Sequence, residues 1–502
     1  MPQPPSDLPL TLGELRKSPH FANLANGTVK DELRRNLICQ LKRKEALFPG
    51  IVGYEDTVVP QMVNAILSRH NFILLGLRGQ AKTRLIRMLT SLLDPWMPYI
   101  SGCKIHDNPL RSICARCRQT ITEHGDTTPV AWLAADDRYI EKLATPDVTI
   151  ADMIGDIDPI KAARSGYNLS DELTVHYGLM PRANRCIFAV NELPDLAGKI
   201  QVGLFNILQE GDIQIKGYPV RLPLDIMMAF TANPEDYTAR GKIVTPLKDR
   251  IGSEIRTHYP AALAHGIEIT RNEAWVKRES EIATRMPIYI AEIIEQLAFC
   301  AREDKRVDKR SGVSQRLPIS VAENAISNAE RRALANAEDL AVPRVLDVYG
   351  ALPAITGKIE LEYEGELKGG DAVGRDLIRL AVGKVFDHYF EGVNMNSVVQ
   401  WFDIGGALKL DEDATSKEMV RQLDGISGLM EKTGALGLTA NEPDAVRAAA
   451  GEFILEGLHA HRRISRSMER GFVAEERKRA PKQEAEQDPA EILRQRQKRQ
   501  FN

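Results

Sequence analysis

The sequence has no apolar run that approaches the roughly 20 residues needed to span a bilayer. Its N-terminus, MPQPPSDLPLTLGELRKS, has no basic start followed by an apolar stretch, so we expect no secretory signal there. Neither charge dominates, because 66 basic residues stand against 69 acidic ones, a net charge of -3. This balance argues against a chain that coats nucleic acid. The absences predict a cytoplasmic protein without membrane insertion.

Cysteine is scarce, with six residues in 502. Three are isolated among apolar neighbours, which is typical of small buried side chains: Cys39, Cys186 and Cys300. The other three lie together between 103 and 117. We see no internal repeat, and the length together with an apolar fraction of 43% allows two or three domains.

Short apolar runs separated by helical segments and glycine loops occupy residues 71 to about 260. The runs that we expect to be strands are 71–77, 128–133, 186–193, 225–234 and 253–260. Runs of this kind that alternate with helices are typical of a parallel sheet buried on both faces. The sequence therefore predicts an α/β nucleotide-binding core.

Hydrophobic periodicity divides the rest of the chain. Segments such as PIYIAEIIEQLAFCAR carry apolar residues at helical spacing, and EERKRAPKQEAEQDPAEILRQRQKRQFN is densely charged with few apolar residues. We expect an N-terminal helical extension over 1–45, followed by the α/β core over 46–262. A helical lid over 263–365, a C-terminal helical region over 366–470 and a disordered charged tail over 471–502 complete the chain.

A phosphate-binding loop follows the first core strand. Its candidate residues are Gly76, Gly79, Gln80, Ala81, Lys82 and Thr83, and the helix RLIRMLTSLL comes directly after them. Backbone N–H groups at the start of such a helix favour anions. We expect Lys82 to reach the β- and γ-phosphates of a nucleotide and the Thr83 hydroxyl to hold Mg²⁺.

One position departs from the usual loop, because Ala81 stands where a glycine commonly precedes the lysine. Alanine is small and has helical backbone preferences, so we expect the loop to tolerate it. The alternative is a glycine-rich turn that arises by chance, and the strand before it and the helix after it disfavour that interpretation.

The strand from Cys186 ends in Asn191-Glu192, where a catalytic acid is expected. Glu192 can act as a general base toward the attacking water. Asn191 offers only an uncharged carbonyl oxygen toward the metal, which leaves the rate of hydrolysis in doubt. The next strand ends in Thr231-Ala-Asn233-Pro, and Asn233 can orient water or phosphate from the opposite side.

The order of these motifs resembles an AAA+ ATPase, in particular the magnesium chelatase ATPase subunit and MoxR-type ATPases. The resemblance covers about 48 to 330, and it is carried by Asp156-Ile-Asp158-Pro, Gly178-Leu-Met-Pro-Arg182-Ala-Asn-Arg185, the Asn191-Glu192 strand and Thr245-Pro-Leu-Lys-Asp249-Arg250-Ile. The fold class implied is a P-loop AAA+ core, a parallel sheet flanked by helices, with a helical lid and a helical C-terminal region.

The resemblance also implies roles for single residues. Lys82 and Thr83 match the Walker A pair, Glu192 the Walker B acid, Asn233 the first sensor, Arg250 the arginine finger that reaches a neighbouring subunit, and Arg316 the second sensor. An arginine stabilises charge that develops on the transferred phosphoryl group. Ordinary surface ion pairs remain the alternative for Arg250 and Arg316.

The resemblance implies a ring, a homo-hexamer that uses ATP with Mg²⁺ to remodel a partner protein. The partner would carry a von Willebrand A domain and be a separate polypeptide, because this chain has no Asp-x-Ser-x-Ser. A non-hydrolysing nucleotide-gated scaffold stays open as an alternative. A nucleic-acid motor is disfavoured by the charge balance, and a sigma-factor activator by the absence of Gly-Ala-Phe-Thr-Gly-Ala.

Two smaller features complete the prediction. GDIQIKGYPVRLPLD, after Glu210, alternates as a hairpin does, with Lys216 and Tyr218 as substrate-facing candidates or as parts of a static hairpin. Separately, four soft ligands occur in two close pairs within an insertion over 103–117: Cys103, His106, Cys114 and Cys117. They predict a structural zinc site in a reducing compartment, against the alternative of unliganded thiols.

Overall fold

The computed structural model describes residues 4–19, 27–166, 168, 171–215, 220–234, 242–278, 282–411, 413–439, 441–467 and 470–475. Within these ranges, no helix is long and apolar enough to cross a membrane. The chain divides into two compact units, one of residues 1–276, 294–324 and 351–375, and one of residues 277–293, 325–350 and 376–502.

A five-stranded sheet forms the centre of the first unit, in the order β11-β1-β10-β7-β4. The strands are β1 (Phe72–Leu75), β4 (Tyr139–Leu143), β7 (Cys186–Asn191), β10 (Ile226–Ala232) and β11 (Ser253–Arg256). All neighbouring pairs run parallel, with Ile73 opposite Phe230 and Leu143 opposite Asn191 in register. The carboxyl ends of β1, β10 and β7 therefore meet at one edge of the sheet.

Alternate side chains of these strands enter two different apolar clusters, one on each face of the sheet. Ile73, Phe188 and Phe230 belong to one cluster, whereas Phe72, Ile187 and Ala229 belong to the other. Burial on both faces explains why the strands read as continuous apolar runs.

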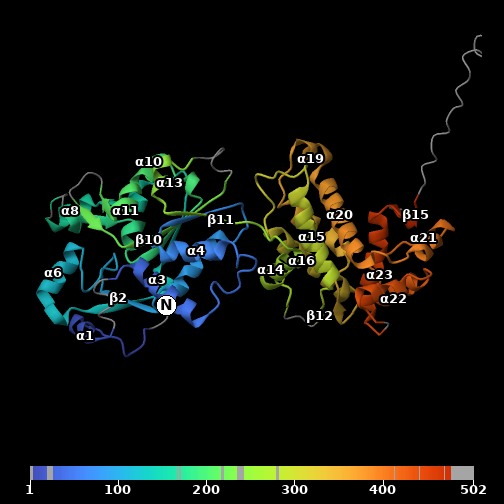
Figure 1. Ribbon diagram of the computed structural model, residues 1–502, viewed down its shortest axis with the longest axis horizontal. Coiled ribbons are helices and arrows are strands. Elements are labelled where there is room, and N and C mark those ends of the chain that lie inside the picture. The colour runs from blue at the N-terminus through green and yellow to red at the C-terminus, as the bar shows by residue number, and fades with distance from the viewer. Residues whose placement is uncertain are drawn as a thin grey trace, which may run out of the picture. The chain divides into compact units, whose positions relative to one another are not determined.

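Helices cover both faces, as Figure 1 shows. The first cluster includes residues of α10 (Gly198–Gly203), α11 (Phe205–Gln209) and α13 (Thr245–Arg250). The second includes residues of α3 (Val29–Arg43), α4 (Val58–Leu67) and α5 (Lys82–Arg87). Helix α3 starts at a capping box between Thr28 and Asp31. The architecture predicted from the sequence, a parallel sheet with helices on both sides and a helical C-terminal region, is confirmed.

One predicted core strand is wrong. The run at 128–133 forms β3 (Val130–Ala134), which pairs antiparallel with β2 (Trp96–Ile100) in a separate two-stranded sheet. The fifth core strand is β4, with the sequence YIEKL, which the sequence analysis passed over. It lies at the edge of the sheet and is only half-buried, and two charged residues, Glu141 and Lys142, interrupt its apolar ones, so no continuous apolar run marks it.

The remaining elements of the first unit decorate the core. They are α1 (Leu12–Lys17), α6 (Ala115–His124), α7 (Ile150–Met153), α8 (Pro159–Ser165), α9 (Leu179–Arg182), the pair β5 (Gly155–Ile157) and β6 (Val175–Tyr177), and α14 (Leu263–Glu273), α18 (Leu352–Thr356) and α19 (Tyr363–Lys368). The predicted hairpin is confirmed as β8 (Asp212–Gln214) with β9 (Arg221–Pro223), and Ile213 and Leu222 are buried. Lys216 and Tyr218 lie outside the described residues.

Three long helices contribute to both units: α15 (Ile288–Glu303), α16 (Arg316–Ala335) and α20 (Gly370–Phe390). The second unit further contains α17 (Val345–Gly350), α21 (Asn396–Asp403), α22 (Ser416–Asp424), α23 (Asp444–Ala460), and the strands β12 (Ala283–Thr284), β13 (Leu340–Ala341), β14 (Ile464–Ser467) and β15 (Gly471–Ala474). Strand β15 pairs with β14, so ordered structure includes the first residues of the predicted tail. Most of that tail lies outside the described residues.

Candidate nucleotide-binding site

The loop between β1 and α5 has the close packing that a phosphate cradle needs. A Cβ atom at Gly76 would lie 2.0 Å from Thr257 Oγ1, and one at Gly79 would lie 2.0 Å from Ser314 Oγ. Gly79 also has a φ of 75°, in the region that favours glycine. Both glycines are therefore required by the shape of the loop.

Ala81 adopts the left-handed conformation, with φ 55° and ψ 16°, at the position before the first residue of α5. The expectation that its helical preference lets the loop tolerate it is wrong, because the backbone here is not right-handed helical. A non-glycine residue in this region costs about 1–2 kcal/mol. Ala81 is thus a point of strain within the loop.

The two predicted phosphate-side groups, Lys82 and Glu192, are joined through Asn233. Lys82 Nζ donates to Asn233 Oδ1 at 2.7 Å and to the Leu77 carbonyl at 2.9 Å. Asn233 Nδ2 donates to Glu192 Oε2 at 2.9 Å. Residues from the ends of β1, β7 and β10 thus form one hydrogen-bonded chain, although 151 residues separate Lys82 from Asn233.

Asn191 is held so that its carbonyl oxygen faces Thr83. Its Oδ1 accepts from the Thr231 hydroxyl at 3.1 Å and lies 3.4 Å from Thr83 Oγ1. Its Nδ2 donates to Glu141 Oε1 at 2.6 Å. A carboxylate can only accept from the amide nitrogen, so Glu141 fixes which way the amide points. The oxygen ligands suited to Mg²⁺, from Thr83 and Asn191, are therefore side by side.

Glu141 is a site residue that the sequence analysis missed. It projects from β4, and its Oε2 also accepts from Arg87 Nη2 of α5 at 2.7 Å. This carboxylate lies next to the uncharged amide of Asn191. The signal was present as a single acidic residue in YIEKL, but without the strand assignment nothing connected it to Asn191.

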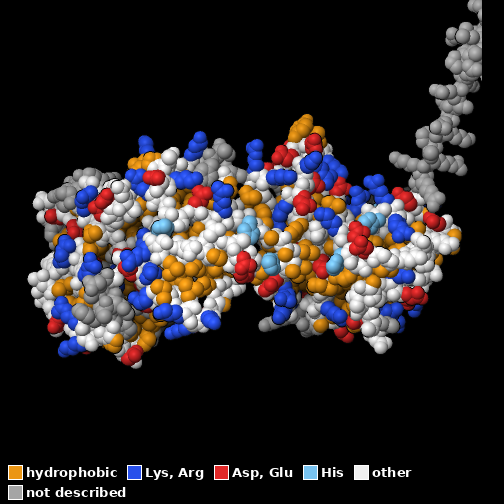
Figure 2. Space-filling model, in the orientation of Figure 1, with side chains coloured by type: hydrophobic (Ala, Val, Ile, Leu, Met, Phe, Trp, Pro, Cys, Tyr) orange, Lys and Arg blue, Asp and Glu red, His pale blue; other side chains and the backbone are white. Residues whose placement is uncertain are grey.

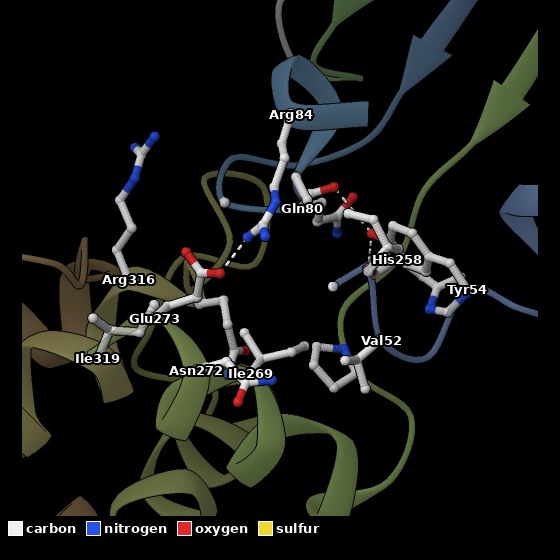
Figure 3. Close-up of a pocket in the computed structure, with 16 residues that line it drawn as sticks. Val52, Tyr54, Gln80, Arg84, His258, Ile269, Asn272, Glu273, Arg316 and Ile319 are labelled. Carbon is white, nitrogen blue, oxygen red and sulfur yellow. Dashed lines mark hydrogen bonds and ion pairs between the residues drawn. The ribbon is translucent and has the colours of Figure 1, made fainter. Parts of the chain in front are cut away.

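A cavity of about 200 Å³ opens beside the loop. Figure 3 shows its walls: Val52 and Tyr54 come from the segment before α4, Ile269 from α14 and Ile319 from α16. The Tyr54 hydroxyl donates to the carbonyls of Gln80 and His258, at 3.0 and 2.7 Å. Burial raises the pKa of Tyr54. An apolar slot beside a phosphate loop has the shape and chemistry to take a nucleobase.

Charged groups border the same cavity. Arg84 of α5 forms an ion pair with Glu273 of α14, as the dashed line in Figure 3 marks. Arg316, the first residue of α16, also lines the cavity and is exposed. The structure therefore brings Arg316 to the cavity beside the loop, and Gln80 of the loop lies there too, with its Oε1 accepting from Thr257.

Arg250 lies apart from these groups. Its Nε donates to Gln209 Oε1 at 3.0 Å, its Nη1 donates to the Pro246 carbonyl at 2.7 Å, and its guanidinium lies over the Phe205 ring. Among the described residues, its partners thus belong to α11 and α13. The structure does not bring Arg250 to the phosphate loop of its own chain.

The predicted metal ligands separate into three and one. The sulfur atoms of Cys103, Cys114 and Cys117 all lie within 4.8 Å of one another and are buried. Hydrogen bonds from the other two thiols hold the pKa of Cys103 below its usual value. His106 lies outside this group, and its Nδ1 is 3.0 Å from the Arg182 carbonyl. A carbonyl only accepts, so Nδ1 carries the proton.

The start of β7 is enclosed by buried charge. Desolvation lowers the pKa of Arg185 to about 10 and raises that of Asp225 to about 6. Asp225 Oδ2 accepts from the Val29 amide at 2.8 Å, and its carbonyl accepts from the Arg185 amide. The amino end of β7 is therefore fixed by groups that have little access to water.

Comparisons with known proteins gave structural likenesses alone. No family model matches the chain, and no curated protein matches it. Among solved structures, the BchI–BchD complex of magnesium chelatase is 19% identical, covers 64% of this chain and 98% of its own, and has a TM-score of 0.34. A RuvB variant of Thermotoga maritima is 12% identical, covers 89% and 91%, and has a TM-score of 0.32.

A third likeness is Hsp104 with casein, 13% identical over 69% of this chain and 55% of that one, at a TM-score of 0.37. All three TM-scores are below 0.5. The account of the site therefore rests on the strand order and the contacts at the phosphate loop.

Proposed function

We propose that this chain binds ATP with Mg²⁺ and hydrolyses it. One observation carries the proposal: the chain Lys82–Asn233–Glu192 joins the phosphate loop to a carboxylate across the ends of three strands. A lysine, an amide and a carboxylate in this order supply phosphate binding, water positioning and proton acceptance. The neighbouring oxygens of Thr83 and Asn191 fit a metal that prefers oxygen ligands.

Each residue then has a defined task. Lys82 exchanges its loop carbonyl partner Leu77 for phosphate oxygens, which neutralises negative charge. Glu192 accepts a proton from the attacking water, and Asn233 holds its carboxylate in place. Thr83 and Asn191 hold Mg²⁺, which supplies charge neutralisation at the transferred phosphoryl group when bound. The apolar slot between Val52 and Ile319 encloses the base.

The assembly we propose is a ring of identical subunits, a homo-hexamer, in which Arg250 completes the site of the neighbouring subunit. This assignment is supported by the position of Arg250 on α13, where its guanidinium reaches only α11 and α13 among the described residues. Such an arginine stabilises charge in the transition state from across an interface. Arg316 serves the same nucleotide from within its own chain.

The work coupled to hydrolysis is, in this proposal, remodelling of a separate protein with a von Willebrand A domain. The resemblance to the chelatase and MoxR branch supports this choice. Figure 2 shows basic and acidic side chains interspersed on the visible face, which is a poor match for a nucleic-acid track. A structural zinc ion at the cysteine cluster is the further cofactor that we propose for this cytoplasmic machine.

Mixing two inactive variants tests the shared site. Glu192→Gln removes the base and Arg250→Ala removes the finger, so each variant alone is expected to turn over ATP about 10²–10⁴ times more slowly than wild type. Co-assembled, some interfaces pair an intact base with an intact finger, and turnover is expected to recover in proportion to those interfaces.

Lys248→Ala is the matched control, because it removes a cation from the same helix. In the wild-type chain Lys248 forms an ion pair with Glu254. We expect it to keep full turnover. Wild-type turnover that rises with protein concentration supports the ring. ATP binding with no turnover in any sample would leave a nucleotide-gated scaffold, the alternative that Asn191 suggests.

A further inference from the structure

Three buried cysteines converge away from the nucleotide site. Cys103, Cys114 and Cys117 are 8%, 4% and 1% exposed, and their sulfur atoms all lie within 4.8 Å of one another. Zinc–sulfur bonds of about 2.3 Å at tetrahedral angles place sulfur atoms about 3.8 Å apart. The cluster has the size to close on one ion, and an odd number of thiols cannot all pair as disulfides.

The backbone around the cluster is organised for these sulfur positions. The buried Asp107 carboxylate accepts from the amides of Ile113 and Cys114, at 3.0 and 2.9 Å. These bonds hold the segment that carries Cys103 next to the segment that carries Cys114. Cys114 caps α6, and its sulfur accepts from the Cys117 amide at 3.3 Å. A helix N-terminus and an N–H···S bond both favour a thiolate.

We propose that Cys103, Cys114 and Cys117 bind a zinc ion as thiolates, with a solvent-derived fourth ligand. Thiolates select soft or borderline metals such as zinc, and iron–sulfur clusters of the common kinds take four cysteines. His106 is not among the proposed ligands, because its ring nitrogens lie outside the group of sulfur atoms; its Nδ1 donates to the Arg182 carbonyl at 3.0 Å.

The ion, through its loop, holds residues 182–185, which lead into β7. Asn184 Nδ2 donates to the Ile105 carbonyl at 3.2 Å, and Arg185 Nη1 donates to the Pro98 carbonyl at 2.7 Å. Together with the His106 bond, the Asn184 bond fastens residues 182–184 to the metal-binding loop, and the Arg185 bond fastens the next residue to β2, which precedes that loop. The metal site stands without the proposed ATPase activity, since none of its ligands touches the nucleotide cavity.

Metal analysis of the full chain tests the site. The protein is produced in medium that contains both zinc and iron, and metal content is measured by inductively coupled plasma mass spectrometry. We expect one zinc per chain in wild type, in the exposed-cysteine control Cys39→Ser and in the buried-cysteine control Cys300→Ala. Cys103→Ser, Cys114→Ser and Cys117→Ser should each lose at least about nine-tenths of it, and His106→Ala should retain it.

A measurement on wild type alone guards against variants that fail to fold. Titration of the thiols with an organomercurial, read by a zinc-sensitive dye, should release zinc in step with the modification of three cysteines. Hydrogen exchange should then rise at 182–190 and stay unchanged in α23. Zinc-free wild type with free thiols, bound iron in place of zinc, a disulfide within the cluster, or loss of zinc in His106→Ala would each overturn the proposal as stated.

Discussion

The two ends of β7 are built differently. At the carboxyl end, Asn191 and Glu192 bond to side chains of neighbouring strands, namely Glu141, Thr231 and Asn233. At the amino end, Asn184 and Arg185 bond to backbone carbonyls of Ile105 and Pro98. Side-chain pairs can exchange partners when a ligand arrives, whereas bonds to backbone carbonyls hold a segment in place.

The carboxyl end of β7 can therefore change its hydrogen-bond partners, whereas the amino end is held in place. A site that must bind, react and release needs polar groups whose partners change, supported by a rigid element. Strand β7 supplies that element, because its burial is complete from Cys186 to Asn191. Substitutions at the carboxyl end test the first role, and substitutions at the amino end test the second.

Removing the Lys82 ammonium should have the largest effect. Lys82→Ala takes away the cation that bonds to Asn233 and the loop carbonyls, so ATP affinity is expected to fall about 100-fold, in line with charge-assisted bonds to phosphate. Binding is measured by isothermal titration calorimetry. Lys199→Ala, on α10, is the control. Equal affinity of Lys82→Ala and wild type would contradict the assignment of the loop.

Exchanging the charges at 141 and 191 should have the next largest effect. Glu141→Gln loses the carboxylate that orients Asn191, and we expect the Mg²⁺ concentration for half-maximal nucleotide binding to rise about tenfold. Asn191→Asp alone should also weaken Mg²⁺ binding, because two carboxylates then face each other.

The double variant Glu141→Gln with Asn191→Asp should recover most of the affinity, since one carboxylate again faces one amide. Lys142→Ala, the next residue on β4, is the control. Additive losses in the double variant would show that Glu141 and Asn191 act independently.

The anchored end should respond to pH through Asp225. Burial raises its pKa from 3.8 to about 6, so its contribution to stability is complete below pH 3.8 and is lost as the pH rises through about 6. The amide side chain that Asp225→Asn introduces cannot ionise. The midpoint of thermal unfolding of this variant should therefore rise relative to that of wild type as the pH increases from 4.5 to 7.5. The exposed Asp136→Asn serves as control. A difference between Asp225→Asn and wild type that is constant with pH would refute this view of Asp225.

Relief of the strained loop should have the smallest effect. Ala81→Gly removes the left-handed strain but adds freedom to the unfolded chain, so we expect the free energy of unfolding to rise by about 0.5 kcal/mol. Ala163→Gly, at an exposed position within α8, gains no relief and should lower it by about 0.5–1 kcal/mol. Urea unfolding measures both, and a loss of stability in Ala81→Gly would contradict the strain.

The sequence predicted the parts of the site that lie on fully buried strands. Strands β1, β7 and β10 are continuous apolar runs, so the sequence predicted the loop after β1 and the ends of β7 and β10, and the structure brings Lys82, Glu192 and Asn233 of these segments together. Strand β4 was missed because two adjacent charged residues interrupt its apolar ones, and Glu141 was missed with it. The run at 128–133 was taken for a core strand because burial in a two-stranded sheet leaves a similar apolar pattern.

Other features needed three-dimensional contacts. The cavity gathers Val52, His258 and Ile319 from segments far apart in the chain, which no local pattern reveals. His106 has ligand spacing from Cys103, but in the structure it lies outside the group that the three sulfur atoms form. The left-handed Ala81 shows that residue type alone does not give backbone conformation at a loop.

Single-turnover hydrolysis most directly tests the central claim that the ends of β1, β7 and β10 form a working ATPase site. Wild type and Glu192→Gln are mixed with Mg²⁺ and a limiting amount of ATP, and phosphate release is followed beside nucleotide binding. The account predicts equal binding and phosphate release about 10²–10⁴ times slower in Glu192→Gln. Equal binding with the same rate of release in both proteins would contradict it.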